Sequence, residues 1–473
     1  MLRFFALRCS QTAVSSSTRS TTLAIRRSLS THATFTQGQG QGQIRMSSTD
    51  TQPKNETQDP PPLIHRGAIA QDRYILRHCI HKTDTGSIWL VEDTKESGFY
   101  SLKAKLRTGR IIPPCECPSE SALLQQATQY DHPGFNLIPH VVEDFGLLES
   151  DGREYDCFVG TLYSREVTSL SRPNLISLPW KVMKQVVFEV LVALDYAHTK
   201  LGIVHGDIKM DNMLLATPSN RDDFIRHWLR NRTAEDQEKT GPVPFPLPDP
   251  DKVTVALTDW ELGHSVDRAE YHDFSIQPDS LRAPEVILGN KWGPPADIWN
   301  LGCIIYEMAT SRMLFTPNPA VRDETSVVLR MLELLNEFPP YMIQTGKYAH
   351  KFFTPEGQLR PPLQKPEHLP LPVLIYYQLT SEEIERPEDI QALSKPEKRE
   401  ELGDFLDFMV EALKIDPNER ASALTLLQHR WLNETAQDVL FRFARENGEE
   451  IPEGSELKEK DKEEEPKSMK DLD

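Results

Sequence analysis

The sequence predicts an α+β protein in which a strand-rich part precedes a larger, mainly helical part. The segments RYILRHCI, SIWLVEDT and YSLKAKL alternate apolar and polar residues, with the period of a half-buried strand. After Trp180, apolar residues recur at helical spacing over several turns. We therefore expect a folded region at 72–435, with an N-lobe of strands at 72–163 and a C-lobe of helices at 164–435.

Local signals predict the other elements. PSESALLQQATQY has a serine cap and helical spacing, and VVEDFGLL and DCFVGTLY alternate like strands. One face of the long helix is apolar and contains Val182, Val186, Val187, Val190, Leu191 and Leu194. Residues 217–251 are polar and rich in proline, so we expect a surface insertion there.

Both ends of the chain differ from its centre. Residues 1–45 hold six arginines, many serines and threonines, and no acid. This is the composition of a mitochondrial presequence, which a negative-inside membrane attracts. The alternative is translation from Met46, which predicts a cytoplasmic or nuclear protein. Residues 46–71 are expected to form a disordered linker, and 436–473 a disordered, highly charged acidic tail.

Charge, cysteines and hydropathy restrict the class of protein. The chain carries −18 and its first 45 residues carry +6, so the remainder carries −24. Such a globule repels nucleic-acid phosphates and favours basic partners. The six cysteines are scattered, which predicts a reducing compartment without disulfides. No apolar run approaches the roughly 18 residues that span a bilayer. We expect the protein to be a monomer.

Residues 203–215 read IVHGDIKMDNMLL, a loop that can carry chemistry. Its polar positions inside an apolar frame are His205, Asp207, Lys209 and Asn212. The loop resembles the catalytic loop of phosphotransferases. Protein kinases usually write it with His-Arg-Asp, whereas small-molecule kinases of the aminoglycoside or choline type often write His-Gly-Asp. Because Gly206 is the middle residue here, the loop alone leaves a protein kinase, a small-molecule kinase or an inactive relative open.

Residues downstream resemble the protein kinase family. Ala283-Pro284-Glu285 is similar to the A-P-E element that ends the activation segment. Asp297, in ADIWNLG, resembles the start of the helix that braces the catalytic loop. Arg420, in DPNERAS, resembles the buried arginine that pairs with Glu285. Small-molecule kinases lack this ensemble. The resemblance implies the bilobal protein-kinase fold, with a small antiparallel-sheet N-lobe and a large, mainly helical C-lobe.

A narrower resemblance begins at Leu329. Between Leu329 and Arg360, Gly-Lys-Tyr leads into Phe-Phe-Thr and a glycine turn, which resembles the insert of SR-protein kinases. The Asp-Trp pair at 259–260 resembles the pair that the fungal branch of this group has where most kinases have Asp-Phe. The resemblance covers about Arg73 to Leu432. It implies a serine/threonine kinase that uses ATP and Mg²⁺, with Arg/Ser-rich proteins as candidate substrates and no direct contact with nucleic acid.

The resemblance implies roles for the loop residues. Asp207 would orient or deprotonate the acceptor hydroxyl, and Lys209 would contact the γ-phosphate and the acceptor oxygen. Asn212 and Asp259 would bind Mg²⁺, a hard cation that prefers oxygen ligands. An alternative register of LTDWELGHS makes Glu261 the metal ligand. We prefer Asp259 because it follows the strand-like VTVAL directly.

Nucleotide contacts are implied in the N-lobe. Lys103 would hold the α- and β-phosphates, with Glu120 as its helical partner and Lys105 as a neighbouring alternative. Of the three glycines in the G-x-G-x-x-G loop, only the last, Gly86, is present. Fewer glycines restrict how closely the backbone approaches phosphate oxygens, so we expect weaker or altered nucleotide binding.

The segment CFVGTLYS would form the hinge that binds adenine. Gly160 would be the gatekeeper, and Thr161 and Tyr163 would offer backbone groups. Gly206 stands where most kinases place an arginine that grips an activation-loop phosphate, so we expect activity without that phosphorylation. The alternative is that Gly206 relaxes a tight turn, and the two explanations are compatible.

The rival function is a pseudokinase, a scaffold with weak or no ATP turnover. The glycine-poor loop and Glu261 favour it. The retained residues argue against it: Lys103, Asp207, Asn212 and Asp259. We therefore prefer the active enzyme. Docking of an Arg-rich substrate is a separate question, because Gln358 follows the glycine of PEGQLR where an acid is expected.

Overall fold

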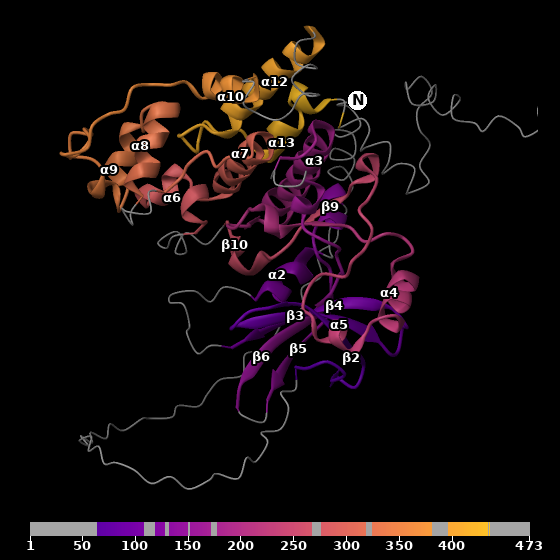
Figure 1. Ribbon diagram of the computed structural model, residues 1–473. Coiled ribbons are helices and arrows are strands. Elements are labelled where there is room, and N and C mark those ends of the chain that lie inside the picture. The colour runs from indigo at the N-terminus through magenta and orange to yellow at the C-terminus, as the bar shows by residue number, and fades with distance from the viewer. Residues whose placement is uncertain are drawn as a thin grey trace, which may run out of the picture. The chain divides into compact units, whose positions relative to one another are not determined.

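The computed structural model describes residues 64–107, 119–127, 132–149, 152–171, 177–266, 276–317, 324–380, 396–433 and 435. The presequence, most of the linker and the charged tail predicted above lie outside these residues. Within them, strands come first along the chain and helices follow, as Figure 1 shows in indigo and then in magenta to yellow. The α+β prediction is confirmed.

Six antiparallel strands form the N-lobe sheet, in the order β1-β2-β3-β4-β6-β5. Their bounds are β1 Ile69–Ala70, β2 Tyr74–Lys82, β3 Gly86–Asp93, β4 Phe99–Leu106, β5 Val141–Leu148 and β6 Glu154–Gly160. The apolar positions of β2, β3 and β4 are buried, as their alternation predicts. β1 falls within the segment that was predicted to be a disordered linker. It forms a strand because its backbone pairs with the start of β2.

One short helix, α2 (Glu120–Gln126), crosses beside this sheet. It begins at Ser119, whose hydroxyl accepts a hydrogen bond from the backbone N–H of Ala122. Leu123 and Leu124 are buried in the main core, and Glu120 is the first residue of the helix. The cap and the apolar pair explain why this segment forms a helix at this place.

The C-lobe is built around α3 (Trp180–Tyr196), which is buried on almost every side. The helix α7 (Pro294–Thr310) packs against it. The other helices are α4 Arg221–Arg230, α5 Ala234–Glu238, α6 Pro284–Leu288, α8 Thr325–Leu334, α9 Pro340–Thr345, α10 Leu371–Thr380, α12 Pro396–Ala412 and α13 Ala423–Leu427. The predicted long helix is confirmed.

Two small antiparallel ladders place the predicted catalytic loop and the segment around Asp259 side by side. One joins β7 (Ile203–Val204) to β10 (His264–Ser265), and the other joins β8 (Met213–Leu215) to β9 (Val255–Leu257). The loop at 205–212 therefore begins and ends at the same two ladders as residues 258–263. This pairing brings together motifs that are about fifty residues apart along the chain.

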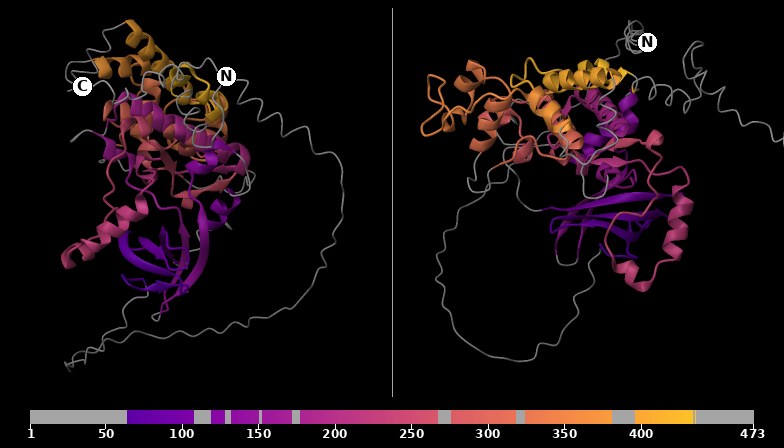
Figure 2. Two further views of the ribbon diagram at one scale, coloured as in Figure 1. Left: turned by 90° about the vertical axis from the view of Figure 1, so that its right-hand side faces the viewer. Right: turned by 45° about the horizontal axis from the view of Figure 1, so that its top comes forward.

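The insertion is not the plain surface excursion that its composition predicts. Its side chains Ile225, Val243 and Phe245 are buried together with Leu90 and Phe99 of the N-lobe. Figure 2 shows α4 and α5 lying alongside the sheet. The apolar residues of α4 that take part in this packing, Phe224, Ile225, Trp228 and Leu229, recur at helical spacing. Most of the insertion is exposed or half-buried, and it has in addition an apolar face that its overall composition does not reveal.

Two sequence-based expectations concern membrane and redox properties. In the part of the chain that the structure covers, no helix is long and apolar enough to cross a bilayer. The cysteines among these residues, Cys79, Cys157 and Cys303, are free thiols. Burial raises the pKa of the Cys157 thiol to about 12, so this group is an inert packing cysteine.

Candidate active site

Asp297, in the first turn of α7, anchors the catalytic loop. Its Oδ2 accepts a hydrogen bond from the backbone N–H of His205 and its Oδ1 accepts one from that of Gly206, both at 2.8 Å. His198 Nε2 lies 2.9 Å from the same carboxylate. Burial acts to raise the pKa of Asp297, but His198 and the other donors outweigh it and lower that pKa. This ionised brace fixes the backbone that leads into Asp207.

Gly206 occupies a backbone conformation that favours glycine. Its φ is +78°, in the left-handed region. A Cβ at this position would stand 3.1 Å from the carbonyl oxygen of Leu262, which cannot move freely because it is backbone. The turn therefore has a conformational reason for glycine, independent of any role in regulation.

We expect Gly206→Ala to lower the free energy of unfolding by about 1–2 kcal/mol, because an L-residue is strained at this φ. Urea denaturation of the two proteins measures the difference. Gly146→Ala in β5 is the matched control, since a Cβ there meets nothing within 4 Å. Equal changes for Gly206→Ala and Gly146→Ala would show that the turn tolerates a side chain.

Asp207, Lys209 and Asn212 form one hydrogen-bonded group. Asp207 Oδ2 lies 2.6 Å from Lys209 Nζ and accepts a hydrogen bond from Asn212 Nδ2 at 3.2 Å. Asn212 Nδ2 also donates to the backbone oxygen of Asp207, at 2.9 Å. Because both contacts use the amide nitrogen, Asn212 Oδ1 is the end left to bind a cation. The structure thus brings these three predicted residues together.

His205 packs beneath this group instead of facing it. Its ring is fully buried, and Nδ1 accepts a hydrogen bond from the backbone N–H of Asp207 at 3.2 Å. Nε2 therefore carries the proton and donates to the carbonyl of Thr258, at 3.0 Å. Burial lowers the pKa of His205. The Trp260 ring lies edge-on to it at 4.6 Å, so the imidazole is a neutral support between the two loops.

Lys103, in β4, makes the contact that links the N-lobe to the C-lobe. Its Nζ lies 2.7 Å from Oε2 of Glu120 and 2.6 Å from Oδ1 of Asp259. The other oxygen of Glu120 accepts a hydrogen bond from the backbone N–H of Trp260, at 3.1 Å. Asp259 has a φ of +63°, a strained value for a residue with a side chain. Glu120 therefore holds both Lys103 and the backbone next to Asp259.

Burial and charge set the ionisation of these three groups. Burial alone would lower the pKa of Lys103, but the Glu120 and Asp259 carboxylates outweigh it and raise that pKa. Burial raises the pKa of Glu120 in spite of Lys103. Burial also acts to raise the pKa of Asp259, but Lys103 outweighs it and lowers that pKa. Asp259 is thus the carboxylate that ionises more readily, as a Mg²⁺ ligand must.

The alternatives to Lys103 and Asp259 form a pair of their own. Lys105 Nζ contacts Oε1 of Glu261, and both side chains are partly exposed. Glu261 therefore points to Lys105, whereas Asp259 points to Lys103, the lysine that also contacts Glu120. The geometry favours the Asp259 register.

Gly86 begins β3, where its backbone pairs with Lys105. A Cβ on it would stand 2.8 Å from the carbonyl oxygen of Ala104. This contact gives the glycine a packing reason in the sheet. The structure does not place Gly86 among the contacts of Lys103, so its predicted role toward ATP stays a prediction.

The predicted hinge follows β6 directly. The N–H of Thr161 donates to the carbonyl of His140 at 3.1 Å, and its carbonyl accepts a hydrogen bond from Ser101 Oγ at 2.8 Å. Each carbonyl has two lone pairs, so that of Thr161 keeps one acceptor site. Among the described residues, none hydrogen-bonds to the backbone N–H of Tyr163. Tyr163 is therefore the better placed of the two to donate to adenine.

Arg420 and Glu285 form a buried bidentate pair. Nη1 and Nη2 of the arginine lie 2.8 and 3.0 Å from the two carboxylate oxygens. The guanidinium also stacks at 5.0 Å over the Trp299 ring. The contact lies in the C-lobe core and ties the start of α6 to the segment after α12.

Two supporting residues escaped the sequence reasoning. His198 contacts Asp297, and its position in AHTKLGIVHGD, seven residues before the loop histidine, was a usable signal. Ser101 donates a hydrogen bond to the Thr161 carbonyl, and it lies two residues before Lys103 in β4. Ser101, in contrast, has neither a charge nor a spacing that marks it in the sequence.

Comparisons with known proteins agree with this geometry. The family described as protein kinase domain matches residues 138–432. A serine/threonine protein kinase of Aspergillus fumigatus is 26% identical over 382 residues, which cover 78% of this chain and 86% of that protein. The serine/threonine-protein kinase SRPK of Physarum polycephalum is 24% identical over 375 residues, which cover 73% and 82%.

A yeast relative is more similar over a shorter stretch. Serine/threonine-protein kinase SKY1 of Saccharomyces cerevisiae is 33% identical over 178 residues, which cover 37% of this chain and 22% of that protein. The family match spans more than half of the chain and includes the catalytic loop, Asp259, Glu285 and Arg420. The chain belongs to the protein kinase family, as an SR-protein-kinase-like serine/threonine kinase.

Proposed function

We propose that this kinase transfers the γ-phosphate of ATP to serine residues in Arg/Ser-rich proteins, with Asp207 orienting the serine hydroxyl. The oxygen of that hydroxyl attacks the γ-phosphorus, the bond to the β–γ bridging oxygen breaks, and ADP leaves. The observation that carries the proposal is the contact of Lys103 with both Glu120 and Asp259. It supports an arrangement in which a lysine and a metal-binding carboxylate face the same phosphates.

Mg²⁺ would be held by Asn212 and Asp259 together with phosphate oxygens of ATP. In the part of the chain that the structure describes, no group of three or more His, Cys, Asp or Glu could hold a metal by itself. That is compatible with Mg²⁺, which proteins commonly bind through one or two side chains plus the phosphates of the substrate. Asn212 Oδ1 and the second oxygen of Asp259 supply two hard ligands. When bound, the cation would neutralise charge on the transferred group.

Three observations support the Arg/Ser preference. The chain after residue 45 carries −24, which attracts cationic peptides. Asp211, in the catalytic loop four residues after Asp207, is exposed, so acidic charge reaches the site itself. The relatives include proteins named SRSF protein kinase 3 and SRPK.

Gly206 supports activity that does not depend on phosphorylation of the activation loop. A residue without a side chain cannot bind a phosphate there. Instead, the catalytic loop is held by hydrogen bonds to Asp297, which His198 also contacts. These interactions need no added phosphate.

The experiment compares kcat/KM for three peptides that differ only in charge: an Arg/Ser repeat, its Gln/Ser counterpart and its Asp/Ser counterpart. We expect the Arg/Ser peptide to be favoured by about tenfold or more at low salt, and the preference to shrink as salt screens the attraction. The chain is assayed before and after phosphatase treatment, and equal rates are expected. Equal kcat/KM for the three peptides would refute the substrate class, and no transfer to any would refute the enzyme itself.

A further inference from the structure

The insertion and the N-lobe enclose a pocket apart from the residues described above. Its walls come from β2, β3, the start of β4 and the residues before β1 on one side, and from α4, α5 and the residues between them on the other. The cavity measures about 630 Å³, in the range of small-molecule sites. Lys103, Glu120, Asp207, Asn212 and Asp259 are not among the residues that line it.

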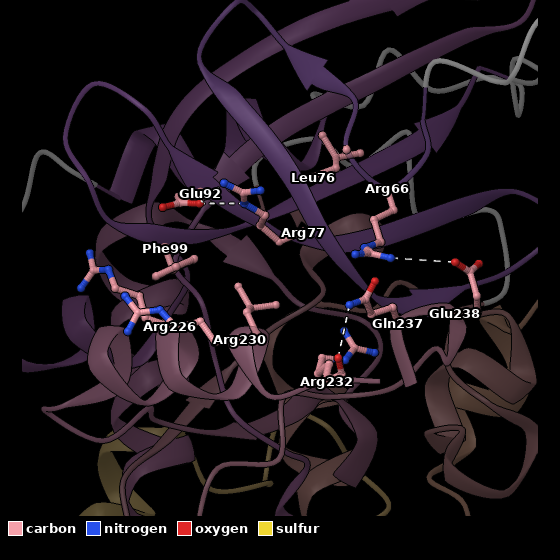
Figure 3. Close-up of a pocket in the computed structure, with 12 residues that line it drawn as sticks. Arg66, Leu76, Arg77, Glu92, Phe99, Arg226, Arg230, Arg232, Gln237 and Glu238 are labelled. Carbon is pink, nitrogen blue, oxygen red and sulfur yellow. Dashed lines mark hydrogen bonds and ion pairs between the residues drawn. The ribbon is translucent and has the colours of Figure 1, made fainter. Parts of the chain in front are cut away.

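Arginine dominates the lining of this pocket, as Figure 3 shows. Among the described residues, the acids that line it are Glu92 and Glu238, so with five arginines the described lining carries +3 in a chain of −18. The arginines are Arg66, Arg77, Arg226, Arg230 and Arg232. They come from three separate segments, so the positive charge is gathered here by the fold and not by a basic run in the sequence.

The acids in the lining do not balance the arginines, although Arg226 also pairs with Asp223, which lies outside the lining, at 3.5 Å. The Glu92 carboxylate forms an ion pair with Arg77, at 2.5 Å. Glu238 lies 3.9 Å from Arg66, and its side chain is 84% exposed, so this pair is weak. Among the described residues, none pairs with the exposed guanidinium of Arg230.

Arg232 carries the clearest sign of an absent partner. Its Nε is buried and has no hydrogen-bond partner in the described chain. Its other nitrogens contact Nδ1 of His78 and the carbonyl of Asp236, which are neutral groups. Burial, and then the charge of Arg66, lower the pKa of Arg232. Arg232 is partly buried, and the carboxylates of Asp236 and Glu238 do not fully offset the effects of burial and of Arg66. A bound anion would accept the missing hydrogen bond from Nε and stabilise the charge.

We propose that this pocket binds a small ligand that carries two or more phosphate groups. Guanidinium groups hold phosphate through paired N–H donors, and arginines line both walls of this pocket. A compact polyanion reaches all three segments at once, whereas an extended phosphopeptide presents its phosphates along a line. By contacting both α4 and the sheet, the ligand would strengthen the packing of the insertion on the N-lobe.

Calorimetric titration of the full chain with tripolyphosphate, in buffer without Mg²⁺, tests the proposal. We expect saturable binding that weakens by at least about tenfold in the double variant Arg66→Gln/Arg230→Gln. Both side chains are exposed, so the variant keeps its fold, which circular dichroism checks. Lys103→Met is expected to leave the dissociation constant within twofold, because Lys103 contacts only the nucleotide site.

Arg107→Gln is the matched control. This N-lobe arginine pairs with Asp156 and Glu154 away from the pocket, so its loss should not affect binding. Inorganic phosphate, with a single group, should bind more weakly than tripolyphosphate. Binding lost in Lys103→Met but kept in the double variant would place the anion at the nucleotide site and overturn the proposal. Tighter, pocket-dependent binding of a doubly phosphorylated peptide would overturn the small-ligand assignment.

Discussion

Asp207→Asn is expected to lower kcat for peptide phosphorylation by about 10²- to 10⁴-fold, the usual contribution of a positioned general base. Asparagine keeps the size of the side chain but cannot accept a proton. Asp207 Oδ2 is also the atom that Lys209 and Asn212 contact, so the substitution weakens both orienting bonds. Initial rates of transfer from γ-labelled ATP to the Arg/Ser peptide measure the effect.

Two companion variants separate chemistry from nucleotide binding. Asp207→Asn should retain the thermal stabilisation that ATP and Mg²⁺ give, whereas Asp259→Asn should lose most of it, because Asp259 is the proposed metal ligand. Asp251→Asn is the control for an exposed aspartate in a surface pair, and we expect no change in rate. A rate for Asp207→Asn within twofold of the unmodified chain would remove Asp207 from the reaction.

The fold could be predicted where the signal is local. The strands β2 to β4 and the helix α3 are set by the period of their apolar residues, which the sequence displays directly. In the insertion, apolar residues recur at helical spacing in α4, but Ile225 and Phe245 are far apart, and the sequence does not show what they pack against. Their partners, Leu90 and Phe99, lie more than one hundred residues earlier. Nothing local in the sequence could indicate that contact.

Prediction of the candidate site was limited by a different ambiguity, which concerns two neighbouring lysines. Lys103 and Lys105 are two residues apart in β4, and residues at that spacing face the same side of a strand, so periodicity cannot choose between them. The distinction comes from their partners: Glu120 contacts Lys103 and Glu261 contacts Lys105. The same contacts separate Asp259 from Glu261. Spacing supplies the candidates, and tertiary structure assigns each carboxylate to its lysine.

Gly206 shows how a sequence-based explanation can be incomplete without being wrong. The absence of an arginine was interpreted first as a regulatory feature. The left-handed backbone and the nearby carbonyl of Leu262 give an additional, purely conformational reason for glycine. The sequence already offered a tight turn as the alternative explanation, and the backbone angle of Gly206 now supports it.

Arg420→Ala is expected to lower the free energy of unfolding by about 3–5 kcal/mol, because it leaves a buried carboxylate without its cation. The side chains of Arg420 and Glu285 are 0% and 1% exposed. The arginine also donates to the carbonyl oxygens of Pro295 and Lys414, and these would lose a partner too. Urea denaturation followed by tryptophan fluorescence measures the change, since Trp299 lies against the guanidinium.

Arg430→Ala is the matched control for this pair. Arg430 contacts Asp404 and Asp407, but its side chain is 58% exposed, so water replaces the lost contacts at a cost of about 1 kcal/mol or less. Glu285→Gln should fall between the two variants, because glutamine can still accept one hydrogen bond from Arg420 while the carboxylate charge is gone. A cost for Arg420→Ala no greater than that for Arg430→Ala would mean that water reaches Glu285, and burial would then not be what gives this pair its strength.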